Sequence, residues 1–185
     1  MELESKVLIR SFPGMPRGGD TGLILEKPDG YLGALIDASG HGLEAYNVAK
    51  QARRVIINSK MTFLDELLLE LDFALKNSIG AAISLVKISE DSLQFAGIGN
   101  VQAYFDEAPL KVRTGVVGVR MRTPHIISVP FESNKWFLMH TDGISRPKST
   151  PNGNAETVAN KIMESYGTRT DDAGILLFRR KTESQ

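Results

Sequence analysis

The order of its hydrophobic patterns constrains the fold of this chain most. Apolar runs bounded by turn residues are typical of strands, and here they come in groups that helical patterns do not separate one by one. Such runs occupy residues 7–12, 21–27, 31–36, 81–88, 93–105, 125–131, 135–141 and 173–180. We predict that 81–88 and 93–105 form a hairpin of two long strands. Grouped strands favour an α+β domain with mainly antiparallel sheets over an alternating parallel fold.

In three segments, the apolar residues recur every three to four positions, which is the period of an α-helix. From Leu43 onward, small and apolar residues recur at three and four positions. A second helix pattern follows Thr62, a suitable N-cap, with Asp65 and Glu66 in the first turn. A third covers residues 155–163. The leucine stripe of the second helix is expected to pack into the core, with a partner surface as the alternative.

The composition excludes several classes of protein. Lys and Arg total 22, as do Asp and Glu, so no overall field favours nucleic acid or an anionic membrane. There is no cysteine, which removes disulfides, thiolate metal sites and a cysteine nucleophile. No apolar stretch approaches the roughly 20 residues that span a bilayer. We expect residues 1–185 to form a single domain of a cytoplasmic, monomeric protein.

Carboxylates stand at the ends of several predicted strands. Asp37 ends one apolar run and is followed by the small Ala38, and Asp142 ends another and is followed by glycine. Asp20 ends a glycine-rich loop, while Asp171 and Asp172 precede the last strand. If these ends meet at one edge of the sheets, the like charges repel by several kcal/mol in a partly dry site, and a divalent cation relieves that repulsion.

Oxygen donors without thiolates are typical of Mg²⁺ or Mn²⁺ sites. Zinc is disfavoured because the three histidines, His41, His125 and His140, make no recognisable chelate. Two ions that share one carboxylate suit the hydrolysis of a phosphate ester, and Asp37, with the Ala38 carbonyl beside it, is the candidate bridge. The alternative is that each aspartate only stabilises a turn by bonding to the backbone.

Six short motifs occur in a familiar order along the chain: GGD, DASGHG, GAAISLV, GIGNV, HTDGI and TDDAGILLF. In order and spacing they resemble the metal-dependent serine/threonine phosphatases of the protein phosphatase 2C superfamily. The bacterial stress-response branch is most similar, in particular the small stand-alone phosphatase of the stressosome. The resemblance covers residues 19–178, and its motifs are specific as an ordered set.

The resemblance implies two stacked antiparallel sheets flanked by helices, an αββα sandwich. It also implies that Asp37 bridges two Mn²⁺ or Mg²⁺ ions, with the Ala38 carbonyl on one ion and Asp142 and Asp171 on the other. Asp20 is implied to bind through a water. In the family, the water or hydroxide between the ions attacks phosphorus without a phosphoenzyme. Asp37 and Asp142 are therefore the residues on which we expect catalysis to depend.

The chain departs from the family at several positions. Ala38 replaces the usual glycine, and Asp172 stands where asparagine is frequent, so either Asp171 or Asp172 could be the direct metal ligand. The family's proposed acid histidine corresponds to Ser39 here; His41 is then either the acid or a helix-start residue. No arginine stands clearly at the phosphate-binding position of the larger enzymes. Arg17 is the candidate.

The resemblance implies a phosphoserine/phosphothreonine protein phosphatase that acts on phosphorylated scaffold proteins of the stressosome. A segment with four basic residues could attract a phosphorylated acidic surface, or it could be a solvated loop. These residues are Lys111, Arg113, Arg120 and Arg122. The alternatives are a metal-free pseudophosphatase that only binds a partner, and a hydrolase of small phosphoesters.

Overall fold

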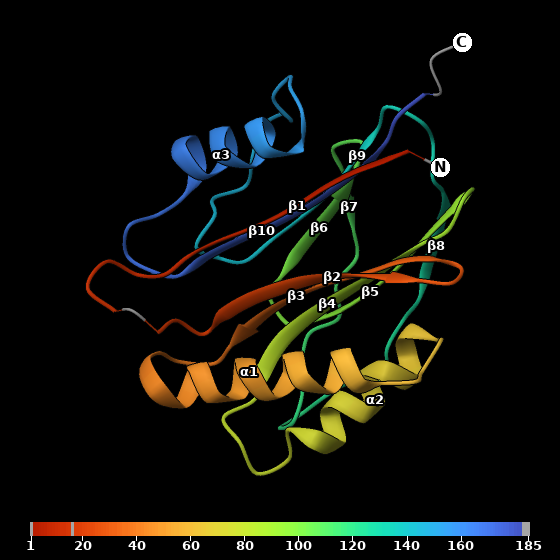
Figure 1. Ribbon diagram of the computed structural model, residues 1–185. Helices are drawn as coiled ribbons and strands as arrows, with labels where there is room; N and C mark the ends of the chain where they lie inside the picture. The colour runs from red at the N-terminus through yellow and green to blue at the C-terminus, as the bar shows by residue number, and fades with distance from the viewer. Residues whose placement is uncertain (1, 16, 183–185) are drawn as a thin grey trace.

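Two five-stranded sheets form the framework of the protein (Figure 1). The computed structural model describes residues 2–15 and 17–182. The first sheet has the order β1-β10-β9-β6-β7 and the second β2-β3-β4-β5-β8, and all their strand pairs are antiparallel. The strands of the first sheet are β1 (Leu3–Arg10), β6 (Gln102–Phe105), β7 (Ala108–Leu110), β9 (Trp136–His140) and β10 (Ala173–Arg180). Those of the second are β2 (Asp20–Lys27), β3 (Gly30–Ala38), β4 (Ala81–Ile88), β5 (Ser92–Ile98) and β8 (Ile127–Pro130).

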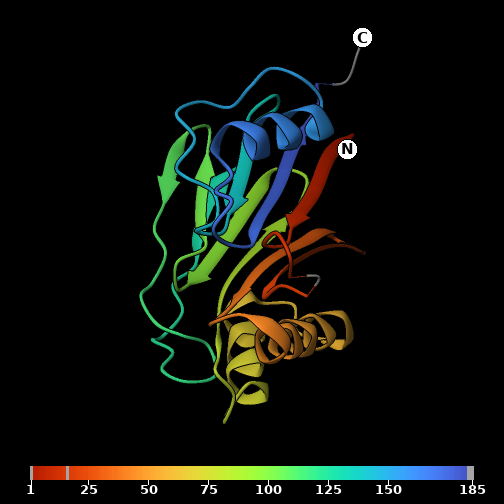
Figure 2. The same ribbon diagram turned by 90° about the vertical axis from the view of Figure 1, so that its left-hand side faces the viewer.

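The sheets stack face to face, and helices cover their outer faces (Figure 2). Helices α1 (Gly42–Asn58) and α2 (Leu64–Ala74) lie on the second sheet, and α3 (Ala155–Tyr166) lies on the first. The expected αββα sandwich is therefore confirmed. No helix in the described ranges, 2–15 and 17–182, is long and apolar enough to cross a membrane.

Central strands are apolar on both faces because each sheet packs against helices on one face and against the other sheet on the opposite face. In β3, Ala34 and Ile36 pack toward α1 and α2, while Leu35 packs between the sheets. The apolar side chains of β10 also alternate between the two faces: Ile175 packs toward α3, and Leu176 packs between the sheets. This two-sided burial explains why the sequence shows continuous apolar runs at these strands instead of alternation.

A glycine on β3 allows the two sheets to approach closely at its position. A Cβ atom on Gly33 would lie 2.7 Å from Cε2 of Phe178 and 2.8 Å from Cγ1 of Val86. A larger residue at this position of β3 would force the sheets apart, because the interior is already close-packed.

The predicted long strand at 93–105 is wrong in one respect. The chain forms two strands there, and they belong to different sheets: β5 ends at Ile98 in the second sheet, and β6 begins at Gln102 in the first. The crossing passes through Gly99, whose φ of 106° and contact with Ala82 exclude a side chain. GIGNV, residues 97–101, thus comprises the end of β5 and the three-residue crossover between the sheets.

Two smaller elements also differ from the prediction. Helix α2 is capped by Phe63, not Thr62, because Phe63 keeps an extended backbone and its carbonyl accepts the first helical hydrogen bond, from Leu67 N. Strand β7 was not predicted; its hairpin turns through Asp106 and Glu107, both at positive φ, where the sequence has no glycine to indicate a turn.

Candidate active site

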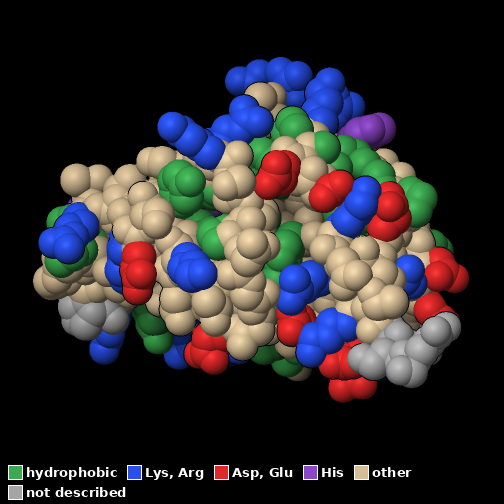
Figure 3. All heavy atoms as spheres, turned by 90° about the horizontal axis from the view of Figure 1, so that it is seen from above, with side chains coloured by type: hydrophobic (Ala, Val, Ile, Leu, Met, Phe, Trp, Pro, Cys, Tyr) green, Lys and Arg blue, Asp and Glu red, His purple; other side chains and the backbone are tan. Residues whose placement is uncertain are grey.

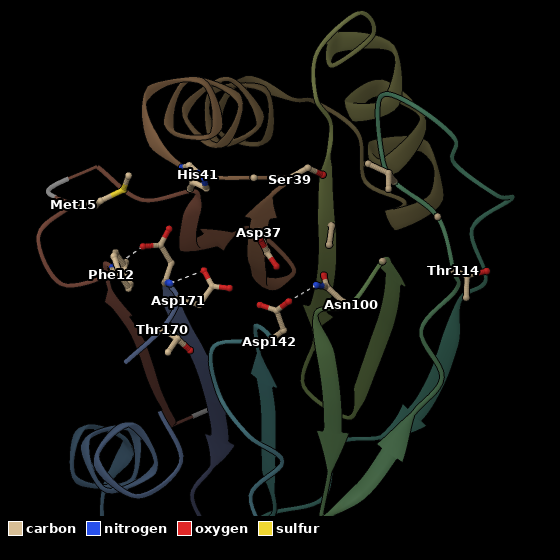
Figure 4. Close-up of a pocket in the computed structure, with 16 residues that line it drawn as sticks. Phe12, Met15, Asp37, Ser39, His41, Asn100, Thr114, Asp142, Thr170 and Asp171 are labelled. Carbon is tan, nitrogen blue, oxygen red and sulfur yellow. Dashed lines mark hydrogen bonds between the residues drawn. The ribbon is translucent and has the colours of Figure 1, made fainter. Parts of the chain in front are cut away.

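A cleft of about 780 Å³ opens where strand ends of the two sheets meet (Figure 4). The carboxylates of Asp37, Asp142 and Asp171 face it, from the ends of β3 and β9 and from the segment before β10. Its lining comprises Phe12, Met15, Asp37, Ser39, Gly40, His41, Ala82, Gly99, Asn100, Thr114, Gly115, Val116, Asp142, Thr170, Asp171 and Asp172. Sequence positions more than 150 residues apart therefore meet at one site.

Asp20 and Asp37 are direct cross-strand neighbours in the register of β2 and β3. Like charges in this position destabilise a sheet. Burial raises the pKa of Asp20 to about 8, and the Asp37 carboxylate adds to the rise. Burial also raises the pKa of Asp37 to about 7, with the Asp142 carboxylate adding to the effect. Ionising both aspartates is thus costly unless a cation binds beside them.

Thr141 connects the site to both sheets and was not singled out from the sequence. Its fully buried hydroxyl donates to Oδ2 of Asp20 on β2 (2.6 Å) and accepts from the backbone N–H of Gly174 on β10 (2.8 Å). One side chain therefore ties the edge of the second sheet to the first at the cleft. The HTDG motif contained the residue, but a threonine before an aspartate carries no signal of its own.

Replacing Thr141 by valine is expected to lower the free energy of unfolding by about 2 to 4 kcal/mol, since it leaves a buried N–H and a buried carboxyl without partners. The measurement is urea unfolding of the metal-free protein. Thr141→Ser keeps the hydroxyl and should cost only about 1 kcal/mol for the lost methyl group. Equal losses in the two variants would show that the hydroxyl does not matter.

Asp142 is solvent-exposed in the cleft and is oriented by Asn100. The Asn100 side-chain amide donates from Nδ2 to Oδ2 of Asp142 (2.8 Å), and the same amide opposes the rise in the pKa of Asp37. Asn100 lies on the β5–β6 crossover, so the topology places it between two strand ends. The prediction of one long strand at 93–105 placed GIGNV inside that strand and gave Asn100 no role at the site.

Asp171 and Asp172 have different surroundings. Asp172 is 7% exposed, and both its oxygens accept backbone hydrogen bonds, from Phe12 N (2.7 Å) and Gly19 N (2.6 Å). Asp171 is exposed in the cleft, and its Oδ1 accepts from the backbone N–H of Asp172 (2.8 Å). The carboxylate of Asp171 faces those of Asp37 and Asp142 in Figure 4, whereas that of Asp172 is engaged by the loop before β2.

Ala38 fits its position without backbone strain. It ends β3 in extended conformation, and its side chain is buried against the α1 side of the sheet. A Cβ atom on Gly19 would lie 2.9 Å from the Ala38 carbonyl oxygen, so the glycine keeps that oxygen uncrowded. Ala38 is only 1% exposed and does not line the cleft, so its carbonyl as a metal ligand stays a prediction.

The turn after β3 gives a structural reason for its two glycines. Gly40 and Gly42 have φ of 78° and 79°, a region that favours glycine, and they flank His41 in extended conformation. His41 is exposed at the cleft and caps α1 without a side-chain hydrogen bond. His140 instead is buried, stacks on the Tyr104 ring, and has its pKa lowered by burial.

Basic side chains lie away from the described part of the cleft. Of the described residues that line it, none is Lys or Arg. The Arg17 guanidinium lies over the Tyr46 ring on α1, at 5.6 Å from its centroid. Arg120 and Arg122 are exposed on the loop before β8. Figure 3 shows a group of Lys and Arg side chains at one edge of one face of the molecule, and further Lys and Arg interspersed with acidic side chains over the rest of that face.

The donor set fits a hard divalent cation, because it consists of oxygens, carries excess negative charge and has no described basic residue to balance that charge. Within 2–15 and 17–182, however, no three acidic or histidine side chains already stand together as a ligand set. Two of the carboxylates are engaged by other groups instead: Asp142 by the Asn100 amide, and Asp172 by backbone N–H groups of the loop before β2.

Comparisons with known proteins give matches among solved structures only. No protein-family model matches the chain, and no curated protein sequence matches it. A chain solved in work on the bacterial stressosome, described as a modular system adapted to control secondary messenger signalling, is 25% identical, with a TM-score of 0.89 over 97% of this chain and 100% of that one.

Of two further similar structures, one was solved with magnesium and the other is that of a serine/threonine phosphatase. RsbX, solved in complex with magnesium, is 19% identical, with a TM-score of 0.85 over 95% of this chain and 94% of that one. The serine/threonine phosphatase PstP/Ppp of Mycobacterium tuberculosis is 12% identical, with a TM-score of 0.75 over 98% of this chain and 100% of that one. The chain thus has the fold of the bacterial serine/threonine phosphatases of the protein phosphatase 2C type, and its resemblance to RsbX and the stressosome branch is confirmed at the level of that fold.

Proposed function

We propose that this protein is a Mg²⁺- or Mn²⁺-dependent phosphoserine/phosphothreonine protein phosphatase. The observation that carries the proposal is the group of acidic side chains that meets at the cleft without a described basic partner, on a fold shared with serine/threonine phosphatases. Such a site attracts divalent cations, and cations in turn attract a phosphate group. Residues 1–185 are proposed to act as one catalytic domain in the cytoplasm.

The proposed ligands follow from the surroundings of each group. Asp37, between Asp20 and Asp142, is the candidate that bridges two ions, with the Ala38 carbonyl beside it. Asp142 and Asp171, both exposed in the cleft, complete the direct ligands. The ions supply activation of a water for attack on phosphorus and neutralisation of the phosphoryl oxygens.

Other residues of the chain orient these ligands. Thr141 holds Asp20, which is proposed to act through a water, and Asn100 fixes the rotamer of Asp142. Asp172 is assigned to the loop before β2, because its two oxygens already accept backbone hydrogen bonds. Such supporting contacts are worth about 10- to 100-fold in metal affinity or activity at metal sites.

The proposed substrates are phosphorylated proteins of a stressosome-like complex. The support is the likeness to a chain from stressosome work and to RsbX. A metal-free binding module is the alternative, but it gives no reason for the costly pair at Asp20 and Asp37. A hydrolase of small phosphoesters is the other alternative.

The test is phosphate release from a phosphoserine peptide with Mg²⁺ or Mn²⁺. We expect turnover with either ion, complete loss with EDTA, and recovery when the ion is added back. Turnover of p-nitrophenyl phosphate but of no phosphopeptide would support the small-phosphoester alternative. Binding of a phosphopeptide without phosphate release under any metal would support the pseudophosphatase.

A further inference from the structure

The cleft is larger than a phosphorylated side chain and its ions require. Its volume of about 780 Å³ falls in the range of sites that enclose drug-sized ligands. Beyond the acidic cluster, it is lined on one side by Phe12 and Met15 and on the other by Thr114 (Figure 4). The residues that flank a phosphorylated side chain therefore meet uncharged walls.

Phe12 is partly exposed although its backbone is held firmly. Its side chain is 38% exposed at the cleft, while its backbone N–H donates to Oδ1 of Asp172 (2.7 Å). The other oxygen of the same carboxylate accepts from Gly19 N (2.6 Å), so one buried side chain pins both ends of the connection between β1 and β2. An aromatic group held in place before binding loses little entropy on contact with a ligand.

A glycine makes this arrangement possible. A Cβ atom on Gly18 would lie 2.5 Å from the Cγ, Oδ1 and Oδ2 atoms of Asp172. The GG of the GGD motif thus leaves room for the carboxylate on one side, at Gly18, and for the Ala38 carbonyl on the other, at Gly19. The same loop that delivers Asp20 to the metal ligands places Phe12 at the cleft.

We propose that Phe12, held at the cleft by Asp172, is a specificity-determining residue that contacts the side chain next to the phosphorylated serine or threonine and selects an apolar residue there. The inference rests on the proposed phosphatase function and adds a substrate class to it. An apolar neighbour gains contact with the exposed part of the ring. An acidic neighbour finds no described Lys or Arg in the lining to pair with, and its charge loses hydration against the uncharged wall.

The experiment uses two pairs of phosphoserine peptides. Within each pair the sequences are identical except for Leu or Asp immediately before, or immediately after, the phosphoserine. The measured quantity is the ratio of kcat/KM for the Leu peptide to that for the Asp peptide, with Mg²⁺ present. We expect a ratio of about ten or more for the native protein in at least one pair.

Variants at Phe12 are expected to change that ratio, whereas a matched control variant is expected to keep it. Phe12→Ala should bring the ratio close to one, and Phe12→Lys should reverse it by attracting the Asp peptide. The control is Phe73→Ala, because Phe73 is also an exposed phenylalanine, at 74%, but lies on α2 outside the cleft. Phe73→Ala should keep the native ratio.

Two failures have different meanings. Equal turnover of Leu and Asp peptides by the native protein, or an unchanged ratio in both Phe12 variants, would overturn the role of Phe12 and leave the phosphatase proposal standing. Absence of phosphate release from every peptide with Mg²⁺ and with Mn²⁺ would overturn the phosphatase proposal itself, and this inference with it.

Discussion

Asp37→Asn is expected to lower kcat/KM for a phosphoserine peptide about a thousandfold or more, while making the metal-free protein more stable. The amide keeps the size of the side chain but removes the charge that the proposed ions share, and the loss of several kcal/mol of charge stabilisation gives a rate effect of that order. Stability should rise because burial and Asp142 make the ionised form of Asp37 costly, as its pKa of about 7 indicates. At pH 8 we expect a gain of about 1 to 3 kcal/mol in the free energy of unfolding.

The measurements are phosphate release with Mg²⁺ and urea unfolding in EDTA. Asp29→Asn is the matched control, because it makes the same change in the turn at the other end of β3, where Asp29 only pairs with Lys87 at the surface (2.7 Å). The control should change neither quantity by much. If Asp37→Asn lost activity and stability together, Asp37 would have a structural role instead.

The metal-free protein is expected to lose several kcal/mol of stability as the pH rises from about 4 to 8. Asp20 and Asp37 have folded-state pKa values of about 8 and about 7, raised by burial and by neighbouring carboxylates. Between the unfolded and folded pKa values, the folded state holds more protons than the unfolded state. The free energy of unfolding therefore falls as the pH rises through this range, and the loss of stability is complete above pH 8.

Mg²⁺ should reverse this loss if the proposed site holds it, because only the folded state brings the ionised carboxylates together. We expect its stabilisation in thermal melts to be small at pH 5 and largest at pH 8. Asp20→Asn in EDTA should show a flatter pH dependence than the native protein, since one of the two raised groups is gone. A native stability that rises with pH in EDTA would contradict the raised pKa values.

The sequence predicted the layers of this fold well, because the layers follow from hydrophobic patterns. Continuous apolar runs at β3, β4 and β10 marked strands that are buried on both faces, and the small-residue stripe from Leu43 marked the helix that covers them. The break between β5 and β6 was not predictable in the same way. Both strands are apolar, and only Gly99 indicates that the chain leaves one sheet for the other.

The candidate site was predictable in its acidic residues but not in the groups that orient them. A carboxylate at the end of a buried strand is conspicuous in sequence, as at Asp37 and Asp142. Asn100 and Thr141 are common polar residues whose partners lie more than 30 positions away, so their roles depend on three-dimensional proximity. The catalytic role of His41 stays a prediction, and its position at the cleft keeps it in reach of a substrate.

The crossover from β5 to β6 has a consequence for how this fold can vary in length. Three residues, 99–101, connect strands in two different sheets. The four Cα–Cα steps from Ile98 to Gln102 reach about 13 to 14 Å when extended, and stacked sheets lie about 10 Å apart, so the connection has only a few ångströms of slack. A deletion here would pull Asn100 away from Asp142, and an insertion would let it drift. Surface loops of this protein can lengthen at little cost, whereas the length of this crossover is constrained because it aligns a ligand of the proposed metal site.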